Sequence, residues 1–152
     1  MAANTSPIYG LTPNIGKTTF GSAALTKSDG SSGVVGIGTD IWIAFTAGAF
    51  GSFVEKIRLI PVATTAATAT TPTVHRVYVS TVTSGVTANT NTTLIAEISA
   101  AAQTADHSTA AIFFLEIPLN IKVPAGWTIL VSTHVVNANN TNWEATCYGM
   151  DF

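Results

Sequence analysis

The segment from Ile117 to Val136, IPLNIKVPAGWTILVSTHVV, constrains the fold more than any other part of the chain. Its first half alternates apolar and polar residues, and a second alternating run begins at Trp127. Between the two runs lies Pro124-Ala125-Gly126, where proline presets φ for the first corner of a tight turn and glycine supplies the positive φ of a later corner. Period-2 segments on either side of such a turn predict a β-hairpin. The apolar face of the first half comprises Leu119, Ile121 and Val123.

Short strands separated by turn-rich loops are expected from Thr39 onward. In the strand from Phe53 to Pro61, alternation places Phe53 and Ile57 on the buried face and Lys56 on the solvent face. The Ala/Thr tract at 62–73 is expected to be a loop or an irregular edge strand, and 99–109 a loop with at most one helical turn. The other strands are expected at 40–46, 74–82, 92–98, 111–117 and 143–148, in addition to the hairpin.

These segments amount to about eight strands without a convincing helix, which predicts an all-β protein. Eight antiparallel strands in two sheets favour a jelly-roll-like antiparallel β-sandwich. An immunoglobulin-like sandwich is the alternative, although the chain lacks the two-cysteine framework of a true immunoglobulin domain.

The N-terminal part of the chain has a different texture. Residues 1–38 are rich in Gly, Ser and Thr and show no sustained periodicity, so they are expected to form an extended N-terminal arm with loops, which could include a short strand near 18–25. The isolated apolar residues of the arm could dock onto their own domain or onto a neighbouring subunit. The expected organisation is therefore an arm at 1–38 and a β-sandwich domain at 39–152.

Charge is scarce in this chain. Charged residues make up 9% of it, against roughly 25% in typical soluble domains, which suits either a neutral soluble domain or a protein that lives inside an assembly. The six lysine and arginine residues are scattered, so no nucleic-acid footprint is expected. No apolar run approaches the roughly 20 residues of a membrane-spanning helix, and the N-terminus does not resemble a signal peptide. The single Cys147 excludes an internal disulfide and fits a reducing compartment.

The residues that might support catalysis are not arranged for it. Gly10 to Thr18 (GLTPNIGKT) resembles a phosphate-binding loop but has five residues, not four, before Gly-Lys-Thr. His75, His107 and His134 lie on different expected elements, with His75 a half-exposed strand residue, and nucleophilic catalysis needs a base held beside its nucleophile. Cys147 is expected to be a small buried hydrophobe.

The acidic residues likewise suggest no site. A zinc or calcium site would need clustered ligands, and Asp and Glu are spread singly along the chain. The strand carboxylates that could pair for glycoside hydrolysis are Glu55, Glu97, Glu116 and Glu144. Glu116 stands out because it lies between two apolar runs. We therefore expect no enzyme, no cofactor and no catalytic, cofactor-binding or metal-binding residues.

The tryptophans raise a carbohydrate-binding alternative, since exposed indole rings stack on sugars. Trp42 is expected in the core. Trp127 follows the Pro-Ala-Gly turn and Trp143 follows an asparagine-rich loop, so either could be exposed. Packing in the core or at a subunit interface is the competing interpretation of both.

The C-terminal third resembles a known family. The pattern Ile-x-Val-Pro-Ala-Gly-Trp-x-Ile-x-Val-Ser at 121–132, then His-Val-Val-Asn-Ala at 134–138, then Tyr-Gly-Met-Asp-Phe at 148–152 resembles small virion proteins of tailed bacteriophages. The resemblance implies a capsid cement (decoration) protein with a jelly-roll-like domain. Such a protein would be a homotrimer on the outside of the virion capsid, made in the bacterial host cytoplasm, and would clamp adjacent copies of the major capsid protein. A phage tail or fibre component and a carbohydrate-binding β-sandwich module that takes a glycan are the alternatives.

Overall fold

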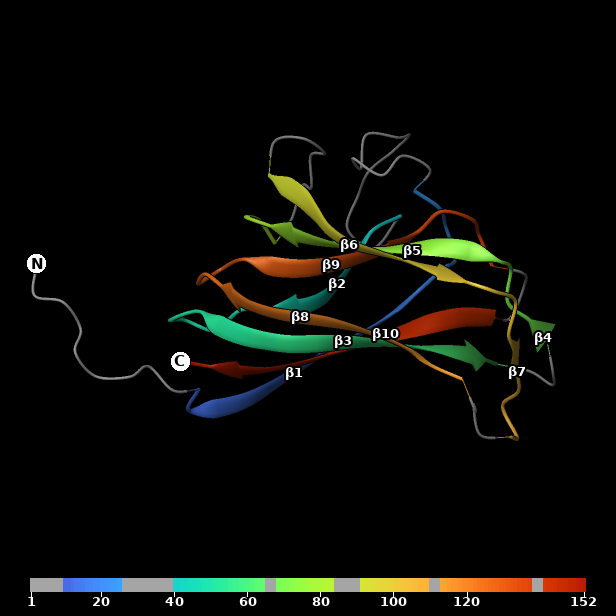
Figure 1. The fold of residues 1–152 in the computed structure, drawn as a ribbon, viewed down its shortest axis with the longest axis horizontal. Helices are drawn as coiled ribbons and strands as arrows, with labels where there is room; N and C mark the ends of the chain where they lie inside the picture. The colour runs from blue at the N-terminus through green and yellow to red at the C-terminus, as the bar shows by residue number, and fades with distance from the viewer. Residues whose placement is uncertain (1–9, 26–39, 65–67, 84–90, 110–112, 138–140) are drawn as a thin grey trace, which may run out of the picture.

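The computed structural model describes residues 10–25, 40–64, 68–83, 91–109, 113–137 and 141–152. All regular elements within these ranges are β-strands, and the described residues contain no helix. The two layers of a sandwich are visible in Figure 1, with the short pair β4 and β7 at one end.

Two four-stranded antiparallel sheets form the molecule. In spatial order, the first sheet contains β1 (Thr12–Phe20), β10 (Thr141–Asp151), β3 (Ser52–Ala63) and β8 (Leu115–Val123). The second sheet contains β2 (Trp42–Thr46), β9 (Thr128–Thr133), β5 (Thr73–Ser80) and β6 (Thr92–Ala100). The short strands β4 (Thr68–Ala69) and β7 (Thr104–Ala105) pair with each other.

The connectivity of the eight long strands is that of a jelly roll. The orders β1-β10-β3-β8 and β2-β9-β5-β6 place most consecutive strands in opposite sheets, as in a double-sheet fold built from two Greek keys. The predicted all-β, jelly-roll-like antiparallel sandwich is therefore confirmed.

The segment Ile117 to Val136 folds differently from the predicted hairpin. β8 pairs with β3 and β9 pairs with β2 and β5, so the two strands lie in different sheets. The turn itself exists: Trp127 N–H donates to the carbonyl of Pro124 at 3.1 Å, and Gly126 has φ +75°. Proline thus precedes the first corner of a turn with glycine at its second corner, the position that requires positive φ in a type II turn. The two runs bury their apolar faces in the same core from opposite sheets. A turn that connects two sheets allows this arrangement, whereas a hairpin would place both strands in one sheet.

The main core lies between the sheets. Its largest fully buried members are Trp143, Phe20 and Phe45, all at most 1% exposed. A second, smaller cluster packs on the opposite side of the second sheet. Its strand members, Tyr78 on β5 and Leu130 on β9, alternate with residues of the main core and therefore point to the other side of the sheet. The second cluster comprises Leu25, Ile41, Tyr78 and Leu130. β9 is accordingly buried on both faces along its whole length.

The structure differs from the predicted division at residue 38. β1 lies inside the predicted arm, yet it pairs with β10 along its entire length, from Thr12 opposite Asp151 to Phe20 opposite Trp143. Further along, Leu25 N–H donates to the carbonyl of Thr133. Residues 1–9 and 26–39 of the predicted arm lie outside the described residues. The sequence of β1 shows no alternation of apolar and polar residues, because the positions before Phe20 that face the other sheet hold small or polar residues.

β3 departs from simple alternation. The register with β10 shifts where Tyr148 lies opposite Lys56 and Gly149 opposite Val54, which leaves Glu55 as an extra residue. Such a β-bulge reverses the facing of every side chain beyond it. Val54 is therefore buried and Phe53 faces outward with Lys56, so the predicted facing of Phe53 was wrong.

Two loop expectations also changed. β3 continues to Ala63, and Thr68–Ala69 and Thr104–Ala105 form a small β pair. No helical turn occurs among the described residues of 99–109.

Candidate functional site

The phosphate-loop-like segment of the sequence is a strand. Gly10 and Leu11 lead into β1, and Lys17 lies within it, where its Nζ forms an ion pair with Glu144 at 2.8 Å. A phosphate-binding loop needs consecutive backbone N–H groups curled around an anion. An extended strand does not offer this arrangement.

The histidines and the cysteine are not assembled for nucleophilic catalysis. Asp106 Oδ1 accepts hydrogen bonds from the backbone N–H and the hydroxyl of Ser108, while His107 lies 3.6 Å from the same carboxylate on the exposed surface. The hydroxyl of Ser108 thus donates to Asp106 and not to the imidazole of His107. Cys147 is fully buried, as predicted, and burial raises the pKa of its thiol to about 12. The described residues include no cluster of three or more His, Cys, Asp or Glu that could hold a metal ion.

His75 was predicted to be half-exposed and is instead completely buried. Its ring packs edge-on against Phe20 and Trp143, with centroids 5.2 and 4.5 Å away. Within the described part of the chain, neither ring nitrogen has a hydrogen-bond partner. Desolvation lowers the pKa of His75 to about 3, so the ring is neutral at physiological pH.

Three of the four strand carboxylates pair with cations in the described part of the chain. Glu144 pairs with Lys17, and Glu97 pairs with Arg76 at 2.7 Å on the second sheet. Glu116, the carboxylate that stood out in the sequence, accepts hydrogen bonds from both Lys56 and Arg58. The hydrogen bond from Arg58, followed by that from Lys56, holds the pKa of Glu116 below its ordinary value. Glu55 is exposed at the bulge.

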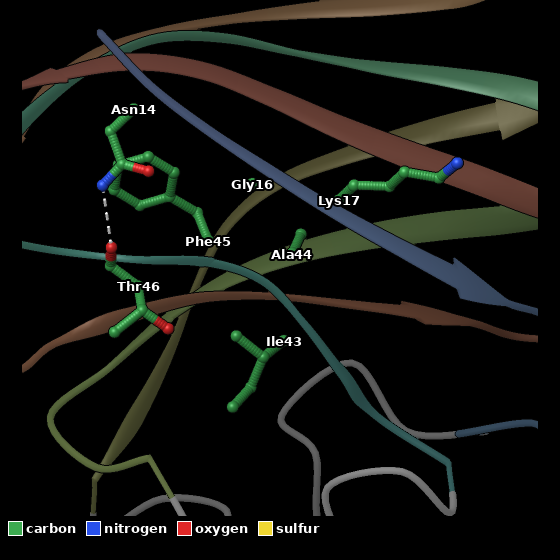
Figure 2. Close-up of a pocket in the computed structure, with 7 residues that line it drawn as sticks. All are labelled: Asn14, Gly16, Lys17, Ile43, Ala44, Phe45 and Thr46. Atoms are coloured by element: carbon green, nitrogen blue, oxygen red, sulfur yellow. Dashed lines mark hydrogen bonds between the residues drawn. The ribbon is translucent and has the colours of Figure 1, made fainter.

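A shallow pocket of about 260 Å³ lies between the edge strands β1 and β2. Figure 2 shows Asn14 and Thr46 joined by a hydrogen bond, while Lys17 extends along β1 away from them. A Cβ on Gly16 would lie 2.0 Å from the carbonyl oxygen of Ala44, so glycine is required for this close approach of the two sheets. Lys17, the one charged residue in the pocket wall, already pairs with Glu144. The pocket is therefore a seam between the two sheets.

The C-terminal sequence Gly149-Met150-Asp151-Phe152 forms a clasp. Asp151 accepts hydrogen bonds from Asn14 of β1, at 2.8 Å, and from the hydroxyl of Ser52 on β3. The hydrogen bond from Ser52, followed by that from Asn14, lowers the pKa of Asp151. A hydrogen bond from the backbone of Gly48 lowers it further. One carboxylate thus ties together β1, β3 and the turn that joins β2 to β3.

The most extensive feature outside the core is the solvent-facing side of the first sheet, which we call the outer face. Residues that oppose each other on neighbouring strands point to the same side of a sheet, so the strand register defines three rows across it. The rows are Pro13–Met150–Phe53–Lys122, Ile15–Tyr148–Lys56–Pro118 and Lys17–Thr146–Arg58–Glu116.

The outer face combines exposed apolar groups with ordered cations. Ile15 is 62% exposed, Met150 41% and Phe114, beside the third row, 52%. The guanidinium of Arg58 lies 4.6 Å from the centroid of the Phe114 ring and 5.8 Å from that of Tyr148. Aromatic residues and arginine are the types enriched in protein interfaces. Sequence reasoning missed this surface because its members come from four strands that are distant in the chain.

The three tryptophans expose little ring surface on which a sugar could stack. Trp143 is fully buried and Trp42 is 9% exposed, so the prediction for Trp42 is confirmed and, for Trp143, core packing is the interpretation that holds. Trp127 is half-buried and packs against the main core.

Comparison with protein-family models, with curated proteins and with solved structures finds no match for this chain. Across the described ranges, no helix is long and apolar enough to cross a membrane.

Proposed function

We propose that this chain is a structural virion protein that binds the outside of a bacteriophage capsid and stabilises it by clamping adjacent major capsid proteins. The observation that carries the proposal is the outer face, a broad surface of exposed Ile15, Phe114 and Met150 interleaved with ordered cations. Contiguous apolar surface on a soluble domain marks an interaction site. A clamp needs such a surface and does not need a cleft.

The size of the outer face suits binding to a repetitive lattice. Four strands about 4.8 Å apart, with nine residues at about 3.3 Å each, cover roughly 600 Å². A typical stable interface buries about 800 Å² per partner, so one such face provides most of an ordinary interface. Repeated copies on a symmetric shell, or the three copies of the proposed homotrimer, then raise the apparent affinity through avidity.

The proposal is tested on particles and shells. Purified empty shells that lack the chain are mixed with it and pelleted, with the chain alone as the control. Particles with and without the chain are then heated and their breakage is followed by the release of DNA. We expect the chain to pellet with shells and the particles that carry it to break at a higher temperature. A chain that stays in the supernatant and leaves the breakage temperature unchanged would contradict the proposal.

The alternative, a phage tail or fibre component, has the same fold and is distinguished from a capsid protein by its location in the particle. Gold-labelled antibody against the chain should decorate heads in electron micrographs, and labelling confined to tails would favour the alternative.

The proposed homotrimer is tested by size-exclusion chromatography with light scattering, in which a monomer at high concentration would contradict it.

A further inference from the structure

The positive charge of the described residues is concentrated on the outer face. Four of the five described lysine and arginine residues lie there, namely Lys17, Lys56, Arg58 and Lys122. The fifth, Arg76, is 7% exposed on the second sheet. Two carboxylates, Glu116 and Glu144, pair with cations of the face, and Glu55 lies at its bulge. The face thus carries four cations and three carboxylates, an excess of one positive charge, although the chain has a net charge of −2.

These cations are held in place. Arg58 donates two hydrogen bonds to Glu116, from Nε at 3.2 Å and from Nη2 at 3.0 Å, and its plane lies over Phe114. Lys56 lies over the Tyr148 ring at 5.7 Å and Lys122 over the Phe152 ring at 5.8 Å. Side chains fixed before binding lose less conformational entropy when they contact a partner.

The apolar part of the face adjoins the cations. Ile15 and Met150 project from neighbouring strands near Pro13, and none of the three packs against the main core. A partner that fits this surface needs a flat apolar patch beside carboxylates. Two copies of this chain placed face to face would instead present the same net positive surface to each other, and like charges oppose such a contact.

We propose that the outer face is the surface that contacts the capsid shell, and that the shell surface it fits carries carboxylates beside a flat apolar patch. This inference rests on the proposed function and adds to it the face that binds and the chemistry of its partner. It also leaves the second sheet facing away from the shell.

The experiment measures the affinity of variants for empty shells that lack the chain. Ile15→Asp places an unpaired charge in the apolar part of the face, and Lys122→Glu reverses a charge at its rim. Ile95→Asp is the matched control, because Ile95 is 37% exposed on β6 of the second sheet. The melting temperature of each variant is measured first. Lys122→Glu, at an exposed position, keeps the test valid should Ile15→Asp fail to fold.

We expect Ile15→Asp to weaken binding about tenfold or more, because burying an unpaired charge is costly, and Ile95→Asp to bind like the wild type. Binding by the wild type should weaken as salt rises, and Lys122→Glu should bind more weakly and depend less on salt.

Four results would overturn the inference in distinguishable ways. If the wild type binds shells and both face variants bind equally well, the inference fails and the proposed function stands. If Ile95→Asp alone loses binding, the second sheet is the contact surface. If the wild type does not bind shells, the proposed function fails and the inference fails with it. A face variant that loses self-association while keeping shell binding would identify a second copy of the chain as the occupant.

Discussion

At the scale of single residues, Asp151 connects the C-terminal strand to the rest of the sandwich. Its carboxylate accepts from Ser52 and Asn14, and a Cβ on Gly48 would lie 2.6 Å from its Cγ, so the turn after β2 is shaped around this group. The Asp in the Gly-Met-Asp-Phe sequence therefore has a structural role, independent of any partner.

Replacing Asp151 with Asn should lower stability, because Ser52 and Asn14 both donate to Oδ1 and a neutral amide oxygen accepts such hydrogen bonds less strongly than a carboxylate does. We expect a loss of about 1–2 kcal/mol, which lowers the melting temperature by roughly 2–8 °C in a chain of this size. Glu55→Gln removes the same charge at an exposed position of β3 and serves as the control. Equal melting temperatures for the two variants would show that the clasp contributes nothing.

His75 should make stability depend on pH. Its pKa is about 3 in the folded chain and 6.5 when unfolded, so the unfolded state binds a proton at a pH where the folded state does not. Stability is therefore complete above pH 6.5 and falls as the pH drops toward 3, by an upper limit of about 4–5 kcal/mol. The lowered pKa of Asp151 adds a further loss only near and below its ordinary value of 3.8.

The His75→Leu variant isolates this effect. Because the imidazole has no hydrogen bonds within the described residues, leucine should be tolerated and should flatten the dependence of stability on pH between 6.5 and 4. Urea unfolding of both proteins across this range provides the measurement. A slope that persists unchanged in His75→Leu would assign it to other groups.

At the scale of elements, the contact between β1 and β2 closes one side of the sandwich. Gly16→Ala would bring a methyl group against the backbone of both Ala44 and Phe45, at 2.0 and 2.8 Å, where no flexible side chain can move away. We expect a loss of about 1–3 kcal/mol or more from overpacking. Gly126→Ala is the comparison, because a Cβ there meets no atom within 4 Å and its cost comes from φ +75° alone. Denaturant unfolding that ranks Gly126→Ala as the more damaging variant would contradict this account of the seam.

The sequence predicted elements where residue type and period agreed, and it failed where they did not. β8 was readable because Ile117, Leu119 and Ile121 alternate with polar residues. β1 was not, because Asn14, Gly16 and Thr18 occupy its sandwich-facing side. Turn chemistry located the corner near Gly126 but carries no information on which sheet receives the next strand, so the hairpin was wrong. The burial of Trp143 follows from the central place of β10 between β1 and β3, which is a long-range property.

At the scale of the whole molecule, the two sheets have different outer sides. The second sheet carries its own apolar cluster, with Leu25 and Ile41 fully buried against Tyr78 and Leu130. The first sheet leaves Ile15 and Met150 exposed among most of the described cations. Sequence alone could not predict this asymmetry, because it depends on the register of four strands that are far apart in the chain.

A reconstruction of the purified particle tests the central claim most directly, since it shows both where the chain lies and which face meets the shell. Our account predicts the jelly roll on the outer surface of the capsid, with Ile15, Tyr148 and Met150 against the shell and β6 directed away from it. A particle whose capsid surface lacks the chain, or one in which the second sheet faces the shell, would contradict the account.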